Sequence, residues 1–378
     1  MEYSAFLRGF LPGILIGLFS SILLFSLWRH STLVERPAQR YSFGLESESS
    51  KGVNIDSQLD TGRKRKERQS RPELDYNKQN ACNSTLYLKT QPVRPGSYLL
   101  LLLIDSSPRA SELRNTIRAT WLNGYARQDK YVVKFIIGTR SLKPGDVQKL
   151  ACENQKYGDL LLLPDINDPV KSQDWSPSEK LLSAFLWALE NVNFAYIFKT
   201  NDATFVLLDP IMKELEVRER DSPTESADFL WGFFAGGVQA TKEGRLAEKD
   251  WFLCTHYLPF PQGGGYIMSH NLVSMLGVLS KDLQHYTHDD IALGVWLSPF
   301  NGIDKKHDVR FNTGYSSRGC NNAYLVTSRE TAQSMFQRYS YFKKTGLICE
   351  EEFLSRLSYV YNWTAAPNRC CIRQPGIP

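Results

Sequence analysis

The fold is decided by the stretch Ala195-Tyr-Ile-Phe-Lys-Thr-Asn-Asp-Ala-Thr-Phe-Val206. Its apolar beginning, residues 195–198, predicts a short buried β-strand. The strand passes directly into the polar residues 199–202, and apolar residues resume at Phe205. Open α/β sheets bind their ligands at such strand ends, where the chain turns out of the core. We therefore expect a binding site at this turn.

Strand-like and helix-like segments alternate on the N-terminal side of this stretch. The predicted strands are 98–104, 131–137 and 159–163, and the predicted helices are 109–121, 147–157 and 178–190. The strands are continuous apolar runs, and the helices have apolar residues at a period near 3.6. This alternation predicts an α/β fold with a Rossmann-type, mixed but mainly parallel sheet and helices on both faces. No G-x-G-x-x-G follows any strand, so a conventional dinucleotide-binding fold is not expected.

Two charged pairs in this sequence have more than one interpretation. Arg114 and Arg118 are four residues apart on a predicted helix, so they share one face. Two guanidinium groups there suit a diphosphate or carboxylate partner, and a solvated or salt-bridged face explains them equally well. Asp289 and Asp290 follow His288 at the start of an apolar helical pattern. Such carboxylates can cap a helix, or they can supply a general base.

A run of three glycines, Gly263 to Gly265, lies between aromatic residues in the second half of the chain. Glycine lets the backbone approach a ligand closely, and the neighbouring aromatic rings could stack on a sugar or a base. A tight buried turn is the alternative interpretation.

The first part of the chain predicts a membrane anchor followed by a tether. Residues 9–28 are uncharged, rich in Leu, Ile and Phe, and about long enough to span a bilayer. We expect a cytoplasmic tail at 1–8, a signal anchor at 9–28, a flexible stem at 29–96 and the folded domain at 97–378. A cleaved signal peptide is the alternative for the apolar segment. The basic run at 63–68 is interpreted as part of the stem, or alternatively as a processing site.

The cysteines and sequons place the folded domain in an oxidising compartment. The chain has seven cysteines and no C-x-x-C pair, and four of them follow residue 310. We expect these four to form disulfides rather than a metal site, and the odd total leaves at least one thiol unpaired or bonded to another chain. Sequons begin at Asn83 and Asn362, which we predict to be glycosylated. The protein is therefore expected to be a type II membrane protein. Its net charge of +5 lies partly in one local run, so no nucleic-acid binding is expected.

From about residue 97 to the C-terminus, the chain resembles the β1,3-galactosyltransferases. Four motifs occur in the order found in that family, namely Arg114-x-x-x-Arg-x-Thr-Trp121, Lys199-x-x-Asp-x-x-Phe205, Gly263-Gly-Gly-Tyr-x-x-Ser269 and Asp289-Asp-Ile-x-x-Gly294. Stretches near the C-terminus, such as Ser317-Arg-Gly-Cys320 and Leu357-Ser-Tyr-Val-Tyr361, resemble the branch of the family that acts on the glycosaminoglycan linker of proteoglycans.

This resemblance implies a GT-A-like fold, a UDP-galactose donor, a Mn²⁺ cofactor and inversion at the anomeric carbon. It implies as acceptor a galactosyl-xylosyl unit on a proteoglycan core protein. It also implies residence in the Golgi membrane and possible association with other Golgi glycosyltransferases. Two alternatives stay open: a non-catalytic relative that binds sugar or scaffolds other Golgi enzymes, and a β1,3-glycosyltransferase with a different donor or acceptor.

The resemblance also assigns roles to individual residues. It implies Asp290 as the catalytic base that deprotonates the acceptor hydroxyl, with Asp289 as second choice. The implied donor-binding residues are Arg114, Arg118, Lys180, Lys199, Asn201 and Asp202. The implied acceptor-binding residues are Gly264, Gly265 and Tyr266, and the implied metal ligands are Asp202 and His307.

One position departs from the pattern of the family. Members usually have three consecutive aspartates where this chain has Asn201, Asp202 and Ala203. The third carboxylate is the expected metal ligand, and an alanine cannot coordinate a metal ion. Mn²⁺ prefers hard oxygen donors, so we expect its binding to be markedly weakened.

Overall fold

The computed structural model describes residues 88–123, 129–168, 176–221, 228–244 and 247–377. These residues belong to one compact unit. The predicted anchor at 9–28, most of the predicted stem and the sequon at Asn83 lie outside them. Within the described ranges, no helix combines the length and apolar character needed to cross a bilayer.

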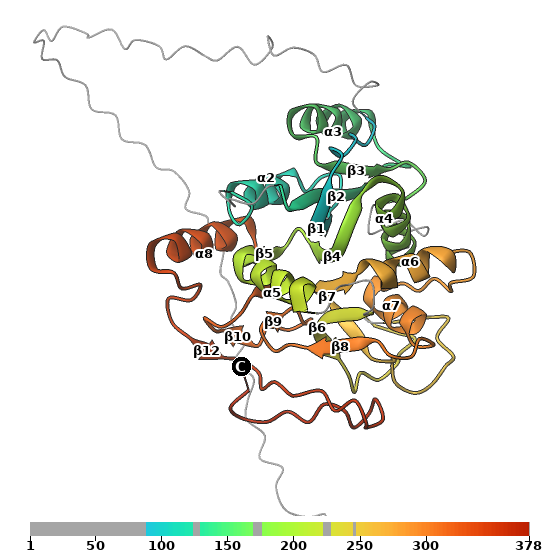
Figure 1. The fold of residues 1–378 in the computed structure, drawn as a ribbon, viewed down its shortest axis with the longest axis vertical. Helices are drawn as coiled ribbons and strands as arrows, with labels where there is room; N and C mark the ends of the chain where they lie inside the picture. The colour runs from blue at the N-terminus through green and yellow to red at the C-terminus, as the bar shows by residue number, and fades with distance from the viewer. Residues whose placement is uncertain (1–87, 124–128, 169–175, 222–227, 245–246, 378) are drawn as a thin grey trace, which may run out of the picture. The chain divides into compact units, whose positions relative to one another are not determined.

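The centre of the fold is a seven-stranded mixed sheet in the order β3-β2-β1-β4-β7-β6-β8 (Figure 1). Its strands are β1 (Ser97–Asp105), β2 (Tyr131–Gly138), β3 (Leu160–Leu163), β4 (Asn193–Asn201), β6 (Phe229–Ala235), β7 (Phe260–Ser269) and β8 (Asp304–His307). The first four strands of this order pair in parallel, and β7 is antiparallel to both β4 and β6. The predicted α/β fold with a mixed, mainly parallel sheet is confirmed.

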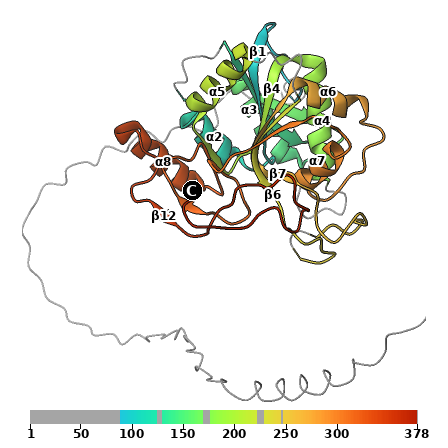
Figure 2. The same cartoon turned by 60° about the horizontal axis from the view of Figure 1, so that its bottom comes forward.

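Helices cover both faces of the sheet, with α4, α6 and α7 on one face and α2 and α5 on the other (Figure 2). The helices are α2 (Ser111–Ala119), α3 (Pro144–Tyr157), α4 (Pro177–Asn191), α5 (Leu208–Asp221), α6 (His270–Val278), α7 (Asp289–Leu297) and α8 (Ala332–Thr345). Because both faces are covered, the apolar run 100–104 of β1 is completely buried. The predicted helix at 109–121 is shorter than expected, since it begins at Ser111 and ends at Ala119.

A small three-stranded sheet lies next to the end of β4. Its strands are β5 (Thr204–Val206), β11 (Val326–Ser328) and β9 (Phe311–Asn312), in the order β5-β11-β9. Strand β5 follows β4 after the turn 202–203, so the small sheet is attached directly to the predicted binding turn. A further pair, β10 (Gly319–Cys320) and β12 (Phe353–Leu354), lies in the C-terminal part.

The glycine run lies within strand β7, so the alternative interpretation of this run as a tight turn is wrong. A Cβ atom on Gly264 would lie 2.8 Å from the Cβ of Ser328 and 2.8 Å from the carbonyl oxygen of Thr313. A Cβ atom on Gly265 would lie 3.0 Å from a methyl group of Val326. Glycine is needed here because the small sheet packs directly on the backbone of β7.

Two disulfides join the last four cysteines, Cys320 with Cys349 and Cys370 with Cys371. The prediction of disulfides in this part of the chain is confirmed. Cys254 is a free, exposed cysteine. It accounts for the unpaired thiol that the odd total predicts.

Candidate functional site

Hydrogen bonds join the predicted binding turn to the end of the neighbouring strand β1. Asp105 of β1 pairs in register with Asn201 of β4. The backbone N–H of Asp202 donates to the carbonyl of Asp105 at 3.0 Å. The hydroxyl of Ser106 donates to Oδ2 of Asp202 at 2.7 Å. Two carboxylates, Asp105 and Asp202, therefore lie at adjacent strand ends on the carboxyl edge of the sheet.

Lys180 of α4 contacts several groups at this edge of the sheet. Its ammonium group is 2.7 Å from a carboxylate oxygen of Asp105 and 2.7 Å from one of Asp168, and it donates to the carbonyl of Ser106 at 2.7 Å. Its side chain is 5% exposed. Lys180 is thus already paired, and it orients Asp105 instead of offering a free ammonium group to a donor. Its direct contact with a donor stays a prediction.

Two of the carboxylates at this edge, Asp202 and Asp168, have raised pKa values. Burial, together with the charge of Asp105, raises the pKa of Asp202 to about 6, against the opposing effect of the Ser106 hydrogen bond. Burial also raises the pKa of Asp168 to about 6, although the neighbouring ammonium group of Lys180 opposes it. The edge therefore holds crowded negative charge that favours a cationic ligand or a cationic side chain.

Arg114 and Arg118 form the salt-bridged face that was one of their two interpretations. Arg114 is completely buried and donates to both carboxylate oxygens of Glu153, at 2.7 and 2.6 Å. Arg118 pairs with Glu153 at 2.8 Å and with Asp159 at 2.7 Å. Both guanidinium groups are therefore paired, and the expected direct contact with a diphosphate is not what the structure provides.

Arg114 nevertheless reaches the binding turn through one intermediary. Its Nη1 atom donates to the hydroxyl of Ser106 at 2.9 Å, and that hydroxyl donates to Asp202. Arg114 thus supports the turn from inside the protein.

The second group of charges lies where β4, β7 and α7 meet. Lys199 of β4 is buried and forms an ion pair with Asp289 at the start of α7. Asp290 accepts a hydrogen bond from the backbone N–H of Gly263 at 3.0 Å. Burial, reinforced by the charge of Asp289, raises the pKa of Asp290 to about 6, while Lys199 opposes the shift. The structure therefore brings Asp289 and Asp290 of α7 close to Lys199, which lies on the strand that ends at the binding turn.

The predicted acceptor residues on β7 are inside the protein. Gly264, Gly265 and Tyr266 are all buried, and the ring of Tyr266 is completely inaccessible. The carbonyl of Gly264 accepts hydrogen bonds from the hydroxyls of Thr200 and Thr204, at 2.8 and 3.1 Å. In this structure the three residues pack inside the protein, and their contact with an acceptor stays a prediction.

Asp202 and His307, the residues predicted for the metal, each have partners within the protein, and so has the neighbouring Asn201. The side-chain oxygen of Asn201 accepts from the backbone N–H of Ala203 at 3.0 Å and from the hydroxyl of Thr204 at 2.9 Å. It is therefore used to close the turn. Within the ranges that the structure describes, no three His, Cys, Asp or Glu side chains are grouped so that they could hold a metal ion.

His307 is engaged elsewhere. Its Nδ1 atom accepts from the backbone N–H of Phe234 at 3.1 Å, and its Nε2 atom lies 3.0 Å from the carbonyl of Tyr359. Its ring stacks on the ring of Tyr359, with centroids 5.3 Å apart. Burial lowers the pKa of His307 to about 4. Both nitrogens are occupied, which argues against the metal role that the resemblance implied.

Glu248 supports the start of α7, although no sequence motif singles it out. It lies in the loop between β6 and β7 and is 1% exposed. Its carboxylate accepts from the backbone N–H groups of Thr287 and His288, each at 2.7 Å, and lies 2.7 Å from Nδ1 of His288. These residues immediately precede Asp289 and Asp290. Glu248 therefore fixes the start of α7, where the carboxylate pair lies.

We expect Glu248→Gln to lower the turnover number kcat by about 10- to 100-fold and to leave the KM for the donor nearly unchanged. The variant loses hydrogen bonds to a charged group, each worth about 1.5–3 kcal/mol, and the position of Asp290 relaxes. Steady-state kinetics would measure both constants. Glu243→Gln, an exposed residue in the same loop, is the matched control and should leave both constants unchanged. A variant that changes only the melting temperature, with wild-type kcat, would show that Glu248 has a structural role alone.

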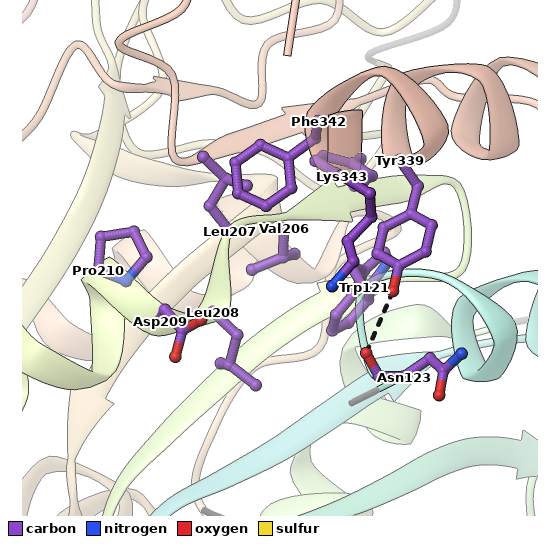
Figure 3. Close-up of a pocket in the computed structure, with 11 residues that line it drawn as sticks. Trp121, Asn123, Val206, Leu207, Leu208, Asp209, Pro210, Tyr339, Phe342 and Lys343 are labelled. Atoms are coloured by element: carbon purple, nitrogen blue, oxygen red, sulfur yellow. Dashed lines mark hydrogen bonds between the residues drawn. The ribbon is translucent and has the colours of Figure 1, made fainter. Parts of the chain in front are cut away.

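A separate pocket of about 90 Å³ lies between α8, the junction of β5 with α5, and the end of α2 (Figure 3). Its wall is mostly apolar and includes Trp121, Phe205, Leu208 and Phe342. None of the predicted site residues lines it. This pocket is therefore distinct from the carboxyl edge of the sheet.

Comparison with known proteins agrees with this arrangement. Residues 112–308 match the model of the family described as Galactosyltransferase. The chain belongs to this family. The match contains all but the first residue of α2, the binding turn, the glycine run and the carboxylate pair. Its residues 304–308 include β8, which pairs with β6 at the end of the main sheet.

Individual relatives support the same conclusion. The chain is 38% identical over 281 residues to Beta-1,3-galactosyltransferase 6 of Mus musculus, and the match covers 74% of this chain and 84% of the mouse protein. It is 24% identical over 275 residues to Beta-1,3-galactosyltransferase GALT1 of Arabidopsis thaliana, covering 69% of this chain and 40% of the plant protein. A solved structure of an LgtC active-site mutant aligns with a TM-score of 0.34 and 11% identity, over 63% of this chain and 94% of that one. That likeness is too low to support an argument.

Proposed function

We propose that the protein is an inverting β1,3-galactosyltransferase that moves galactose from UDP-galactose to the galactosyl-xylosyl unit of the proteoglycan linker. The observation that carries the proposal is the pair Asp289 and Asp290. Asp289 forms an ion pair with Lys199, on the strand that ends at the binding turn, and Asp290 accepts from the backbone N–H of Gly263. The family membership and the mouse relative support it. We further propose that the protein works in the Golgi lumen, anchored by residues 9–28, and is glycosylated at Asn362.

In the proposed reaction, Asp290 accepts the proton of the acceptor hydroxyl. That oxygen then attacks the anomeric carbon of galactose, and the bond from this carbon to the oxygen of UDP breaks. Attack from the face opposite UDP inverts the anomeric configuration. A base with a pKa of about 6 is largely ionised at pH 7 and still binds a proton, as a general base requires. Asp289 is engaged by Lys199, which favours Asp290 as the base.

Incubation of the full-length chain with UDP-galactose and a galactosyl-xyloside tests this proposal. Formation of the β1,3-linked product, identified by mass spectrometry and NMR, is the expected result. A parallel screen of other nucleotide sugars and acceptors detects a transferase of changed specificity. Folded protein that transfers no sugar with any divalent metal, or without one, would contradict catalysis.

Ala203 favours a second candidate function, a non-catalytic relative that binds sugar or scaffolds other Golgi enzymes. The variant Ala203→Asp restores the carboxylate usual for the family. Activity in this variant, from a native chain that has none, would support the second candidate over the first.

A further inference from the structure

The residue that follows strand β11, next to the backbone of Ala203, is an arginine with an unusual backbone conformation. Strands β5 and β11 are antiparallel, and their last pair joins Thr204 with Ser328. Continued pairing would place Arg329 opposite Ala203. Instead, the N–H of Glu330 donates to the carbonyl of Ala203 at 2.8 Å. Arg329 therefore lies outside the regular pairing, directly after the end of β11 at Ser328.

The backbone of Arg329 is strained. Its φ angle is +70°, and it is the only non-glycine residue with positive φ within the described ranges. Glycine is the usual residue in this left-handed conformation, because a Cβ atom clashes there. Strained residues of this kind often lie at binding sites, where the surrounding structure holds them. An arginine at this position therefore makes the fold less stable than a glycine would.

The guanidinium group of Arg329 has no carboxylate partner among the residues that the structure describes. The residue is exposed, and its guanidinium carbon lies 5.2 Å from the centre of the Tyr315 ring. By contrast, Arg114 is paired with Glu153, and Lys180 and Lys199 are paired with aspartates. Among these basic groups around the binding turn, Arg329 is the one whose charge is not already neutralised.

A nucleotide-sugar donor brings a doubly negative diphosphate to an edge that already holds Asp105 and Asp202. A cation is needed there to offset the combined negative charge. At the position where family members usually have the metal-binding carboxylate, this chain has Ala203. A guanidinium group binds phosphate oxygens through two parallel hydrogen bonds. We propose that Arg329 binds the donor diphosphate directly and makes donor binding independent of a divalent metal. This inference rests on the proposed function, since it requires a nucleotide-sugar donor.

Calorimetric titration of the full-length chain with UDP tests the proposal, first in EDTA and then with Mn²⁺. We expect UDP to bind in EDTA, with an affinity that Mn²⁺ changes by less than about threefold. Arg329→Gln and Arg329→Gly should each weaken UDP binding at least about tenfold under both conditions, because charged hydrogen bonds are lost. Arg94→Gln is the control: Arg94 is exposed and precedes β1, at the opposite end of that strand from Asp105, and its substitution should change nothing.

Arg329→Gly also separates binding from folding, because glycine removes the strain. Its melting temperature should equal or exceed that of the native chain, while its UDP affinity falls. The proposal is overturned if Mn²⁺ raises the UDP affinity of the native chain about tenfold or more, or if both variants bind UDP normally. In either of these results the proposed function still stands. A chain that binds no UDP under either condition overturns both.

Discussion

Asp290→Asn should lower kcat for galactosyl transfer by about 10²- to 10⁴-fold, which is the usual contribution of a general base. The amide cannot take the proton of the acceptor hydroxyl at any pH. Its oxygen can still accept from the N–H of Gly263, so the local backbone should remain in place. Transfer assays at saturating UDP-galactose measure the loss, and calorimetry should show unchanged UDP affinity.

Asp282→Asn is the matched control for Asp290→Asn, because Asp282 is exposed and lies in the segment before α7. It should retain full activity. The native enzyme should also lose activity as the pH falls below about 6, because Asp290 becomes protonated and can no longer act as a base. An Asp290→Asn variant that keeps more than about a tenth of native kcat would rule out Asp290 as the base. Asp289 would then be the candidate base.

Local patterns were sufficient to predict the four parallel strands β1 to β4 of the main sheet. The apolar run in β1 and the polar turn after β4 each depend on residues close together in the sequence. Their burial and their strand ends follow from that local order. The carboxylate pair at the start of α7 was found in the same way. These parts of the prediction agree with the structure.

The partners of the charged residues could not be predicted, because they come from distant parts of the chain. Arg118 meets Glu153 of α3, and His307 meets the carbonyl of Tyr359. Glu248 reaches His288 across 40 residues. A residue type and a spacing identify a charge, but only the tertiary structure shows whether another side chain already neutralises it. The glycine run shows the same limit, since its packing partner is the small sheet.

Arg114→Met should destabilise the protein by about 3–5 kcal/mol, the usual cost of removing one partner from a buried ion pair. The side chain of Arg114 is 0% exposed, and that of Glu153 is 9% exposed. Methionine leaves Glu153 with Arg118 alone and removes the hydrogen bond to Ser106. Urea unfolding monitored by tryptophan fluorescence measures the change in the free energy of unfolding.

The control for this variant is Arg109→Met, on the segment just before α2. Arg109 pairs with Asp146, but its side chain is 69% exposed, so the cost should stay below about 1 kcal/mol. A similarly small loss of stability in Arg114→Met would contradict the importance of the buried network.

The loss of Arg114 should also affect ligand binding. Because the hydroxyl of Ser106 joins Arg114 to Asp202, loss of Arg114 should also weaken UDP binding, whereas Arg109→Met should not. The two variants together therefore test whether the core supports the binding turn.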